Sequence, residues 1–221
     1  MPQPARSEAR LRVDAARNRQ ALIDAARAVY GQRGLDAPLD DIARQAGVGN
    51  ATLYRHFPTR CALVGAVFAD TLQRVLDAAE QALGNPDPWL AFASHVKFLC
   101  RLQATDRGLA DLLTTEVAGA PELENLRRRA HAVFARLAQR AQASGALRAD
   151  FVTEDILVLL IANAGLVHRT ARAAPDAWDR FTDLALDGLR ATPQSQPAAR
   201  PPAPRLMRQV MRTKGRTLGY G

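Results

Sequence analysis

The sequence contains little cysteine and few aromatic residues. Only 2 of its 221 residues are cysteines, and Cys61 and Cys100 are far apart and form no CxxC pair. This indicates no disulfide framework and fits a reducing compartment, so we interpret both as small buried or half-buried side chains. Aromatic residues make up 5% of the chain. No stretch alternates apolar and polar residues as a strand does, so nothing indicates a β protein.

Long apolar runs are also missing. The longest covers about twelve residues, 156–167, and includes Asn163, which is too short to cross a bilayer. The first ten residues, MPQPARSEAR, are polar and lack the apolar segment of a signal peptide. We therefore expect a cytoplasmic protein with no membrane span.

Signatures of catalysis and metal binding are absent as well. The four histidines, His56, His95, His131 and His168, are isolated, with no HxxxH spacing. No GxSxG motif, P-loop or dinucleotide-type glycine pattern occurs. Glu116 and His131 could be imagined as an acid–base pair, but nothing in the sequence fixes their geometry. We expect no enzyme, no catalytic or metal-binding residues and no cofactor.

The apolar residues that are present favour helices. Hydrophobic residues make up 48% of the chain and are mostly alanine, leucine and valine. Their spacing predicts an all-α fold, with Thr59 and Thr153 as helix N-caps. The expected helices cover residues 18–33, 39–46, 50–57, 60–83, 89–103, 106–117, 121–141, 153–170 and 178–189.

The net charge of +8 is unevenly distributed. Residues 1–65 carry a net charge of +4, residues 66–190 carry −2, and residues 191–221 carry +6. Basic ends around a balanced centre favour a polyanionic partner, nucleic acid more readily than a membrane. We divide the chain into a basic arm that could be partly helical, two helical domains and a basic tail, at residues 1–17, 18–65, 66–190 and 191–221.

The segment 39–57 has the spacing of a helix-turn-helix unit. Ala43 is small enough to lie where two helices cross, and Gly47 can adopt the left-handed conformation that ends a helix. Leu53 and Phe57 would anchor the second helix. Its other positions offer an amide, a methyl group, hydroxyls, a cation and a ring N–H, which suit base edges and phosphates; they are Asn50, Ala51, Thr52, Tyr54, Arg55 and His56.

Structural roles for some of these residues remain open. Tyr54 could seal the small domain, His56 could cap the end of the helix, and Arg55 could be solvated.

The string LDDIARQAGVGNATLYRHFPTRCALVGAV strongly resembles the DNA-binding segment of the TetR (tetracycline repressor) family of bacterial regulators. The resemblance covers residues 18–68 at the level of motifs. It implies base or phosphate contacts by the first residues of the second helix, and phosphate contacts by His56 and Arg60. The DNA-binding candidates are Arg44, Asn50, Ala51, Thr52, Tyr54, Arg55, His56, Thr59 and Arg60.

Two positions depart from the family pattern. Pro38 and Leu39 precede Asp40 where a capping Ser or Thr and a cation are common, so a base contact by Asp40 would require a cytosine donor. Cys61 stands where a charged residue is common.

The resemblance further implies a larger helical domain that binds a small-molecule effector and forms a homodimer. The candidate ligand-binding residues are Phe68, Leu72, Trp89, His95, Phe98, Glu116, His131, Phe134, Asn163 and Val167. Most can equally be core, and the polar ones can equally be satisfied core groups. The candidate dimer-interface residues are Ile156, Leu160, Gly165, Trp178, Phe181 and Leu184; burial of the last two helices within a monomer is the alternative.

The tail 191–221 contains five prolines and no acidic residue, which predicts disorder. Within it, 205–216 places apolar residues on one side, so this part could instead order on phosphates or an acidic surface.

The chain is therefore expected to be a sequence-specific transcriptional regulator, a ligand-released repressor that binds a double-stranded DNA operator. The alternatives are a constitutive or architectural DNA-binding protein without a ligand, and a helical ligand binder or enzyme.

Overall fold

The computed structural model describes residues 4–117, 119–193, 198–201, 203, 205–207 and 209–211, with side chains from residue 12 onward. The expected all-α fold is confirmed. Within the described residues, the only β pairing is an isolated antiparallel bridge between Leu147 and Arg190. The helices are α1 Pro4–Arg33, α2 Leu39–Gln45, α3 Asn50–His56, α4 Arg60–Leu83, α5 Pro88–Thr105, α6 Arg107–Thr114, α7 Pro121–Ala143, α8 Asp155–Thr170 and α9 Ala177–Leu189.

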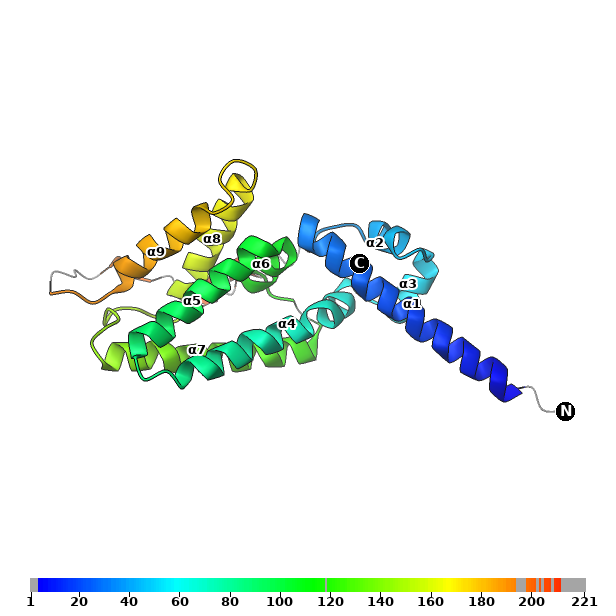
Figure 1. Cartoon of the computed structure of the whole chain (residues 1–221), viewed down its shortest axis with the longest axis horizontal. Coiled ribbons are helices and arrows are strands. Elements are labelled where there is room, and N and C mark those ends of the chain that lie inside the picture. The colour runs from blue at the N-terminus through cyan, green and yellow to red at the C-terminus, as the bar shows by residue number, and fades with distance from the viewer. Residues whose placement is uncertain are drawn as a thin grey trace.

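Helix α1 is much longer than the sequence pattern indicated. It begins at Pro4 instead of residue 18, because its first half is rich in alanine and arginine and contains no glycine or proline after Pro4. The helix ends at Gly34, which has a φ of 82° and donates its N–H to the carbonyl of Tyr30 at 2.8 Å. Residues 4–17 thus extend α1 beyond the small domain (Figure 1).

The small N-terminal domain packs α2 and α3 against the second half of α1 (Figure 1). Its core contains fully or nearly fully buried side chains from all three helices, namely Leu22, Ala26, Tyr30, Ile42, Ala43, Leu53 and Phe57. Burial of a large apolar side chain such as Leu22 or Ile42 stabilises the folded domain by about 1.5–3 kcal/mol. This domain therefore has a core of its own, although its helices α2 and α3 are short.

Helix α4 connects the two domains and runs along α7 in the larger one (Figure 1). Thr59 is its N-cap, as expected, and its hydroxyl accepts from the N–H of Ala62 at 3.1 Å. At the other end, Arg140 of α7 donates to the carbonyls of Leu83 and Asn85. Both ends of α4 are therefore held in place by side chains.

The larger domain consists of α5–α9 around an aromatic cluster. Phe92 is fully buried and contacts three aromatic rings, at centroid distances of 5.4–5.9 Å, from Trp89, Phe134 and Phe151.

The prediction of Thr153 as the N-cap of α8 was wrong. This helix begins at Asp155, and its start is fixed instead by the Asp155 carboxylate, which accepts from the N–H of Val152 at 2.9 Å.

Part of the C-terminal tail packs on this domain, which differs from the expected disorder. Residues 205–207 and 209–211 are helical, and Met207 is buried. The N–H of Glu116 donates to the carbonyl of Met211 at 3.3 Å, and the N–H of Ala198 donates to Asp150 at 2.7 Å. Residues 194–197, 202, 204, 208 and 212–221 of the predicted tail lie outside the described residues.

No helix among the described residues combines the length and the hydrophobicity that crossing a membrane requires. Among the described residues no disulfide occurs, as interpreted from the sequence; Cys61 is half-buried and Cys100 is buried. Burial raises the pKa of Cys100 to about 11, so this thiol stays protonated and acts as a small apolar side chain.

Candidate DNA-binding surface and ligand pocket

The turn between α2 and α3 has the geometry that the spacing of Ala43, Gly47 and Leu53 predicted. Gly47 adopts a φ of 70°, and the N–H of Val48 donates back to the carbonyl of Ala43 at 3.0 Å. This is the hydrogen-bonding pattern of a Schellman-type helix end. Ala43 and Leu53 are each 1% exposed. The two helices therefore meet at small and well-packed residues, and the outer face of α3 is left free.

The outer face of α3 is polar and open to solvent. Asn50, Ala51 and Arg55 are exposed, whereas Thr52 and His56 are half-buried. The Tyr54 side chain is 50% exposed, so its ring does not seal the small domain. An aromatic ring held out in solvent beside an amide, a hydroxyl and a cation suits contacts with DNA bases and phosphates.

Two aspartates of α2 position neighbouring groups of this surface. Asp40, for which a base contact was in doubt, accepts from the amide of Asn50 at 2.9 Å. Asp41 accepts from Arg33 at 2.5 Å and from Arg44 at 3.0 Å. The hydrogen bond from Arg33 contributes most to holding the pKa of Asp41 below its usual value. The start of α3 is therefore tied to α2, which fixes the orientation of Asn50.

Arg60 is engaged within the protein. Its guanidinium donates to the carbonyl of Leu35 at 2.9 Å and to that of Ala37 at 2.5 Å. These bonds join the start of α4 to the turn between α1 and α2. Burial raises the pKa of the adjacent Tyr30 to about 12, against the opposing effect of the Arg60 charge. Phosphate binding by Arg60 stays a prediction, but the structure shows that this side chain also has a structural role.

Helix α6 gives the larger domain a second contact with the small one. Asp111 accepts from the N–H of Leu35 at 3.0 Å. Gly108 lies so close to α1 that a Cβ atom there would be 2.9 Å from Cζ of Phe68 and 3.0 Å from the carbonyl oxygen of Tyr30. The contact through α6 depends on tertiary packing, and the short apolar spacing of this helix did not reveal it.

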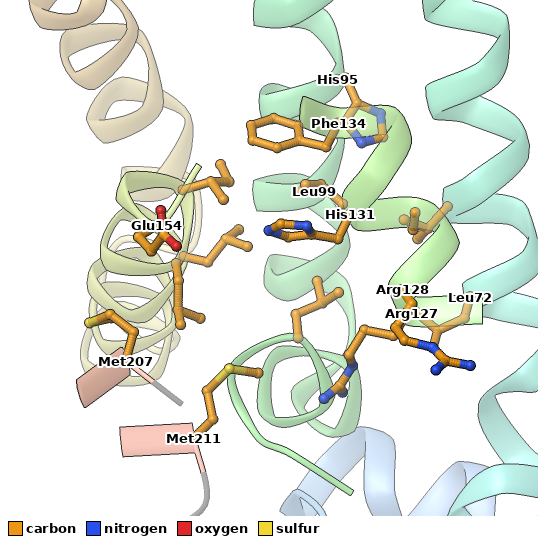
Figure 2. A pocket seen from close by; sticks show the side chains of 16 residues that line it. Leu72, His95, Leu99, Arg127, Arg128, His131, Phe134, Glu154, Met207 and Met211 are labelled. Atoms are coloured by element: carbon orange, nitrogen blue, oxygen red, sulfur yellow. The ribbon is translucent and has the colours of Figure 1, made fainter. Parts of the chain in front are cut away.

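The larger domain contains a mostly apolar pocket of about 500 Å³. It is bounded by α4–α8 and by the C-terminal segment, as Figure 2 shows. Phe134 and His131 point from α7 across the pocket, toward Glu154, which immediately precedes α8. The lining residues are Leu72, Val75, His95, Leu99, Leu113, Arg127, Arg128, Ala130, His131, Phe134, Glu154, Ile156, Leu157, Leu160, Met207 and Met211.

Four of the ten ligand-binding candidates line this pocket, namely Leu72, His95, His131 and Phe134. The other six, Phe68, Trp89, Phe98, Glu116, Asn163 and Val167, are not among its lining residues.

The positions of three of these six explain the difference. Phe68 stacks on Tyr30 at 6.3 Å between centroids, and Trp89 lies under the guanidinium of Arg190 at 4.4 Å. Asn163 is a buried core residue that donates to the carbonyl of Cys100 at 3.2 Å and to the Gln103 side chain at 2.9 Å.

The pocket also includes residues that sequence reasoning missed. Arg127 donates to the carbonyls of Thr115 at 2.6 Å and Leu112 at 2.5 Å, and burial lowers its pKa to about 10. Met207 and Met211 come from the tail. Both lie on the apolar side of the basic segment 205–216, which was the available signal. That pattern, however, suggested a segment that orders on phosphates or an acidic surface.

His95 differs from the other polar residues of the pocket. It is 4% exposed and lies between the rings of Phe98 and Phe134, at centroid distances of 6.1 and 6.2 Å. Its Nδ1 atom is buried and has no hydrogen-bond partner among the described residues. Desolvation lowers its pKa to about 4, so the imidazole is uncharged near neutral pH.

The proposed dimer-interface residues divide into two groups. Ile156 and Leu160 are buried within the chain and line the pocket, and their place in an interface stays a prediction. The helical pattern could not distinguish this inner face of α8 from the outer one. Leu184 is 54% exposed, Gly165 is exposed, and Trp178 and Phe181 are half-buried. This outer face of α8 and α9 remains a predicted interface.

The fold and the α2–α3 geometry define a helix-turn-helix protein with a separate, larger helical domain. Comparisons with known proteins agree with this definition. Residues 22–67 match the family described as bacterial regulatory proteins of the tetR family, and residues 87–191 match the SbtR-like C-terminal domain of transcriptional regulators. No curated protein sequence matches at a significant level.

Solved structures show the same relationship. A TetR transcriptional regulator of Streptomyces coelicolor is 35% identical, with a TM-score of 0.50 over 79% of this chain and 99% of that one. The chain belongs to the TetR family of bacterial transcriptional regulators, which implies regulation through DNA binding.

Two further solved structures share the fold at lower identity. FadR of Bacillus subtilis, in complex with stearoyl-CoA, is 17% identical with a TM-score of 0.57 over 77% of this chain and 98% of that one. RolR, in complex with resorcinol, is 21% identical with a TM-score of 0.52 over 90% of this chain and 94% of that one.

Proposed function

We propose that this regulator is a repressor that binds operator DNA through α3 and is released when a small molecule occupies the pocket. One observation carries the proposal: two of the helices that line the pocket, α4 and α6, also contact the small domain. The similar folds solved with stearoyl-CoA and with resorcinol add that such a fold accommodates a ligand.

The DNA-binding half of the proposal rests on the outer face of α3. Ala51, Tyr54 and Arg55 are exposed there, and Asp40 holds Asn50 in place. A seven-residue helix that projects such groups can lie in the major groove and reach a few bases. Because one such helix supplies few contacts, useful affinity requires two copies.

The second copy is supplied by a homodimer formed through α8 and α9. Val158 of α8 is 44% exposed and Leu184 of α9 is 54% exposed, and large apolar side chains of this kind are suited to an interface. In a two-fold dimer, the two α3 helices would enter successive major grooves about 34–36 Å apart. A shift of a few ångströms would then prevent simultaneous contact.

The switching half rests on α4 and α6. Helix α4 carries Leu72 and Val75 at the pocket and Arg60 at the small domain. Helix α6 carries Leu113 at the pocket and Asp111 at the same α1–α2 turn. A ligand that displaces either helix acts on the small domain through one rigid element. Typical coupling energies of about 1–3 kcal/mol correspond to roughly 5- to 150-fold changes in DNA affinity.

The DNA-binding half is tested with an operator selected from fragments of the source genome. We expect Tyr54→Ala to weaken operator binding by ~1–3 kcal/mol, with unchanged helicity and oligomeric state. The matched control is Leu90→Ala, an equally exposed apolar residue of α5, which should bind as the wild type does. Equal operator affinity in both variants, measured by fluorescence anisotropy, would refute the assignment of α3.

The switching half is tested with a ligand found by thermal-shift screening. A saturating ligand should reduce operator affinity, and operator DNA should reduce ligand affinity by the same factor. Phe134→Ala should lower the affinity for the ligand without lowering the affinity for DNA. A ligand that stabilises the protein but leaves operator affinity unchanged would show that the pocket does not control DNA binding.

A further inference from the structure

We propose that the pocket selects a mostly apolar molecule that carries an uncharged oxygen group, a hydroxyl or a carbonyl, and that His95 forms a hydrogen bond to this group. The inference rests on the proposed function, because it names the chemical class of the effector for the same pocket.

The walls of the pocket exclude a strongly polar ligand. Eleven of the sixteen lining residues are apolar, from Leu72 on α4 to Met211 in the tail. The volume of about 500 Å³ is that of a site for a drug-sized molecule. Transfer of apolar surface into such a pocket is favourable, whereas transfer of an unpaired charge is costly. Most of the ligand is therefore apolar.

The charged residues of the pocket do not offer a site for one sign of charge. The Arg127 guanidinium is occupied, since it donates to the carbonyls of Thr115 and Leu112. Arg128 is exposed and Glu154 is half-buried, so a solvent-accessible cation and a carboxylate border the pocket together. The lining therefore carries charges of both signs and is not uniformly cationic or anionic.

His95 is the buried polar residue of the pocket that lacks a partner. Its side chain is 96% shielded from solvent, as its exposure of 4% shows, and its Nδ1 atom has no hydrogen-bond partner among the described residues. A neutral imidazole has one donor and one acceptor nitrogen. A ligand hydroxyl can pair with either nitrogen and a carbonyl with the donor, so each would satisfy a group that is costly to leave unpaired.

The same imidazole disfavours ionised ligands. The rings of Phe98 and Phe134 flank it, and desolvation by its surroundings keeps it neutral. A carboxylate or an ammonium group brought to this position would lose its hydration and gain only one hydrogen bond to an uncharged partner. His95 therefore discriminates by charge as well as by hydrogen bonding.

The test uses the full-length protein, Nile red as a neutral reporter of the pocket, and four competitors with ten-carbon chains at pH 7.5. These are 1-decanol, 2-decanone, decanoate and decylamine. We expect 1-decanol and 2-decanone to displace Nile red at concentrations about tenfold lower than the two ionised competitors. His95→Leu should raise the concentration of 1-decanol required by about tenfold and change that of decanoate less than twofold.

Two variants serve as controls. His95→Gln retains a donor and an acceptor and should keep the preference for 1-decanol; it also decides the matter if His95→Leu fails to fold. His168→Leu removes an exposed histidine of α8 that does not line this pocket and should likewise keep the preference.

The outcomes separate the two proposals. Equal displacement by 1-decanol and decanoate, unchanged 1-decanol binding in His95→Leu, or a lost preference in His95→Gln would overturn the inference and leave the effector pocket standing. Failure of wild-type protein to bind Nile red would overturn both the inference and the switching half of the proposed function. If 1-decanol shows the predicted dependence on His95 but does not alter operator affinity, the inference holds and the proposed switch fails.

Discussion

Leu35 of the DNA-binding domain donates its backbone N–H to Asp111 of the larger domain at 3.0 Å. The carbonyl of the same residue accepts from Arg60 at 2.9 Å. The turn between α1 and α2 is thus held from one side by α6 and from the other by α4. In the proposed switch, a movement in the larger domain would reach α2 and α3 through this turn.

Removal of the Asp111 carboxylate should therefore loosen the contact between the domains. We expect Asp111→Ala to lower the free energy of unfolding by ~1–3 kcal/mol, because the buried Leu35 N–H loses its acceptor. Urea unfolding measures this change. Asp77→Ala is the matched control, since Asp77 is exposed and accepts a hydrogen bond from Gln73 one turn away on α4. An equally large loss of unfolding free energy in Asp77→Ala would show that the hydrogen bond between the domains makes no specific contribution to stability.

The close approach of α6 to α1 predicts a steric effect at Gly108. An added Cβ would lie 2.9 Å from Cζ of Phe68 and 3.0 Å from backbone of Tyr30, so Gly108→Ala should destabilise the protein by ~1–3 kcal/mol through overpacking. Gly31→Ala tests the same junction without a clash, because its nearest neighbour, the Asp106 carboxylate, lies 3.6 Å away. We expect this control to retain or gain stability. A higher melting temperature for Gly108→Ala than for Gly31→Ala would contradict the packing argument.

Arg60 and Arg55 should differ in what their removal affects. Arg60→Ala removes two hydrogen bonds to carbonyls and should lower stability by about 2 kcal/mol. Arg55→Ala, at an exposed position, should change stability by less than about 0.5 kcal/mol and reduce the salt dependence of DNA binding by about one counterion. Urea unfolding and salt-dependent anisotropy distinguish them. Equal stability of the two variants would remove the structural role of Arg60.

The tail can be tested with two adjacent residues. Met207 is 8% exposed and lines the pocket, whereas Leu206 is 48% exposed. We expect Met207→Gln to destabilise the protein by ~1–3 kcal/mol through lost apolar burial and to weaken Nile red binding. Leu206→Gln should stay within about 0.5 kcal/mol of the wild type. Identical behaviour of the two variants in thermal unfolding would show that the tail does not pack on the larger domain.

The buried His95 predicts a pH dependence of stability. Burial lowers its pKa from 6.5 to about 4, so the unfolded chain binds a proton at pH values where the folded protein does not. Stability should therefore fall as pH decreases through this window, and the contribution of His95 between pH 8 and pH 5 is about 2 kcal/mol.

Urea unfolding of His95→Leu at pH 8, 6.5 and 5 checks this prediction. The variant should show a shallower decline than the wild type by that amount, whereas His131→Leu leaves the His95 contribution in place and should decline as the wild type does. If the free energy of unfolding of His95→Leu falls with decreasing pH as steeply as that of the wild type, His95 is not a buried, neutral imidazole.

The sequence by itself determined the features that depend on local spacing. The helices could be predicted because apolar residues recur at helical intervals. The turn at Gly47 could be predicted because its φ of 70° favours a residue without a side chain. The exposed face of α3 followed from the same periodicity, since burial of Leu53 and Phe57 directs the intervening side chains outward.

Only the tertiary structure decided which helix faces meet and which polar groups are paired. Helical spacing marks Ile156 and Leu160 as apolar but does not tell whether they face the pocket or another chain. It cannot reveal that Asn163 finds Gln103, sixty residues away in sequence, while His95 finds no partner. The tail position of Met207 was equally hidden. These outcomes depend on contacts between distant segments, and local periodicity carries no information about them.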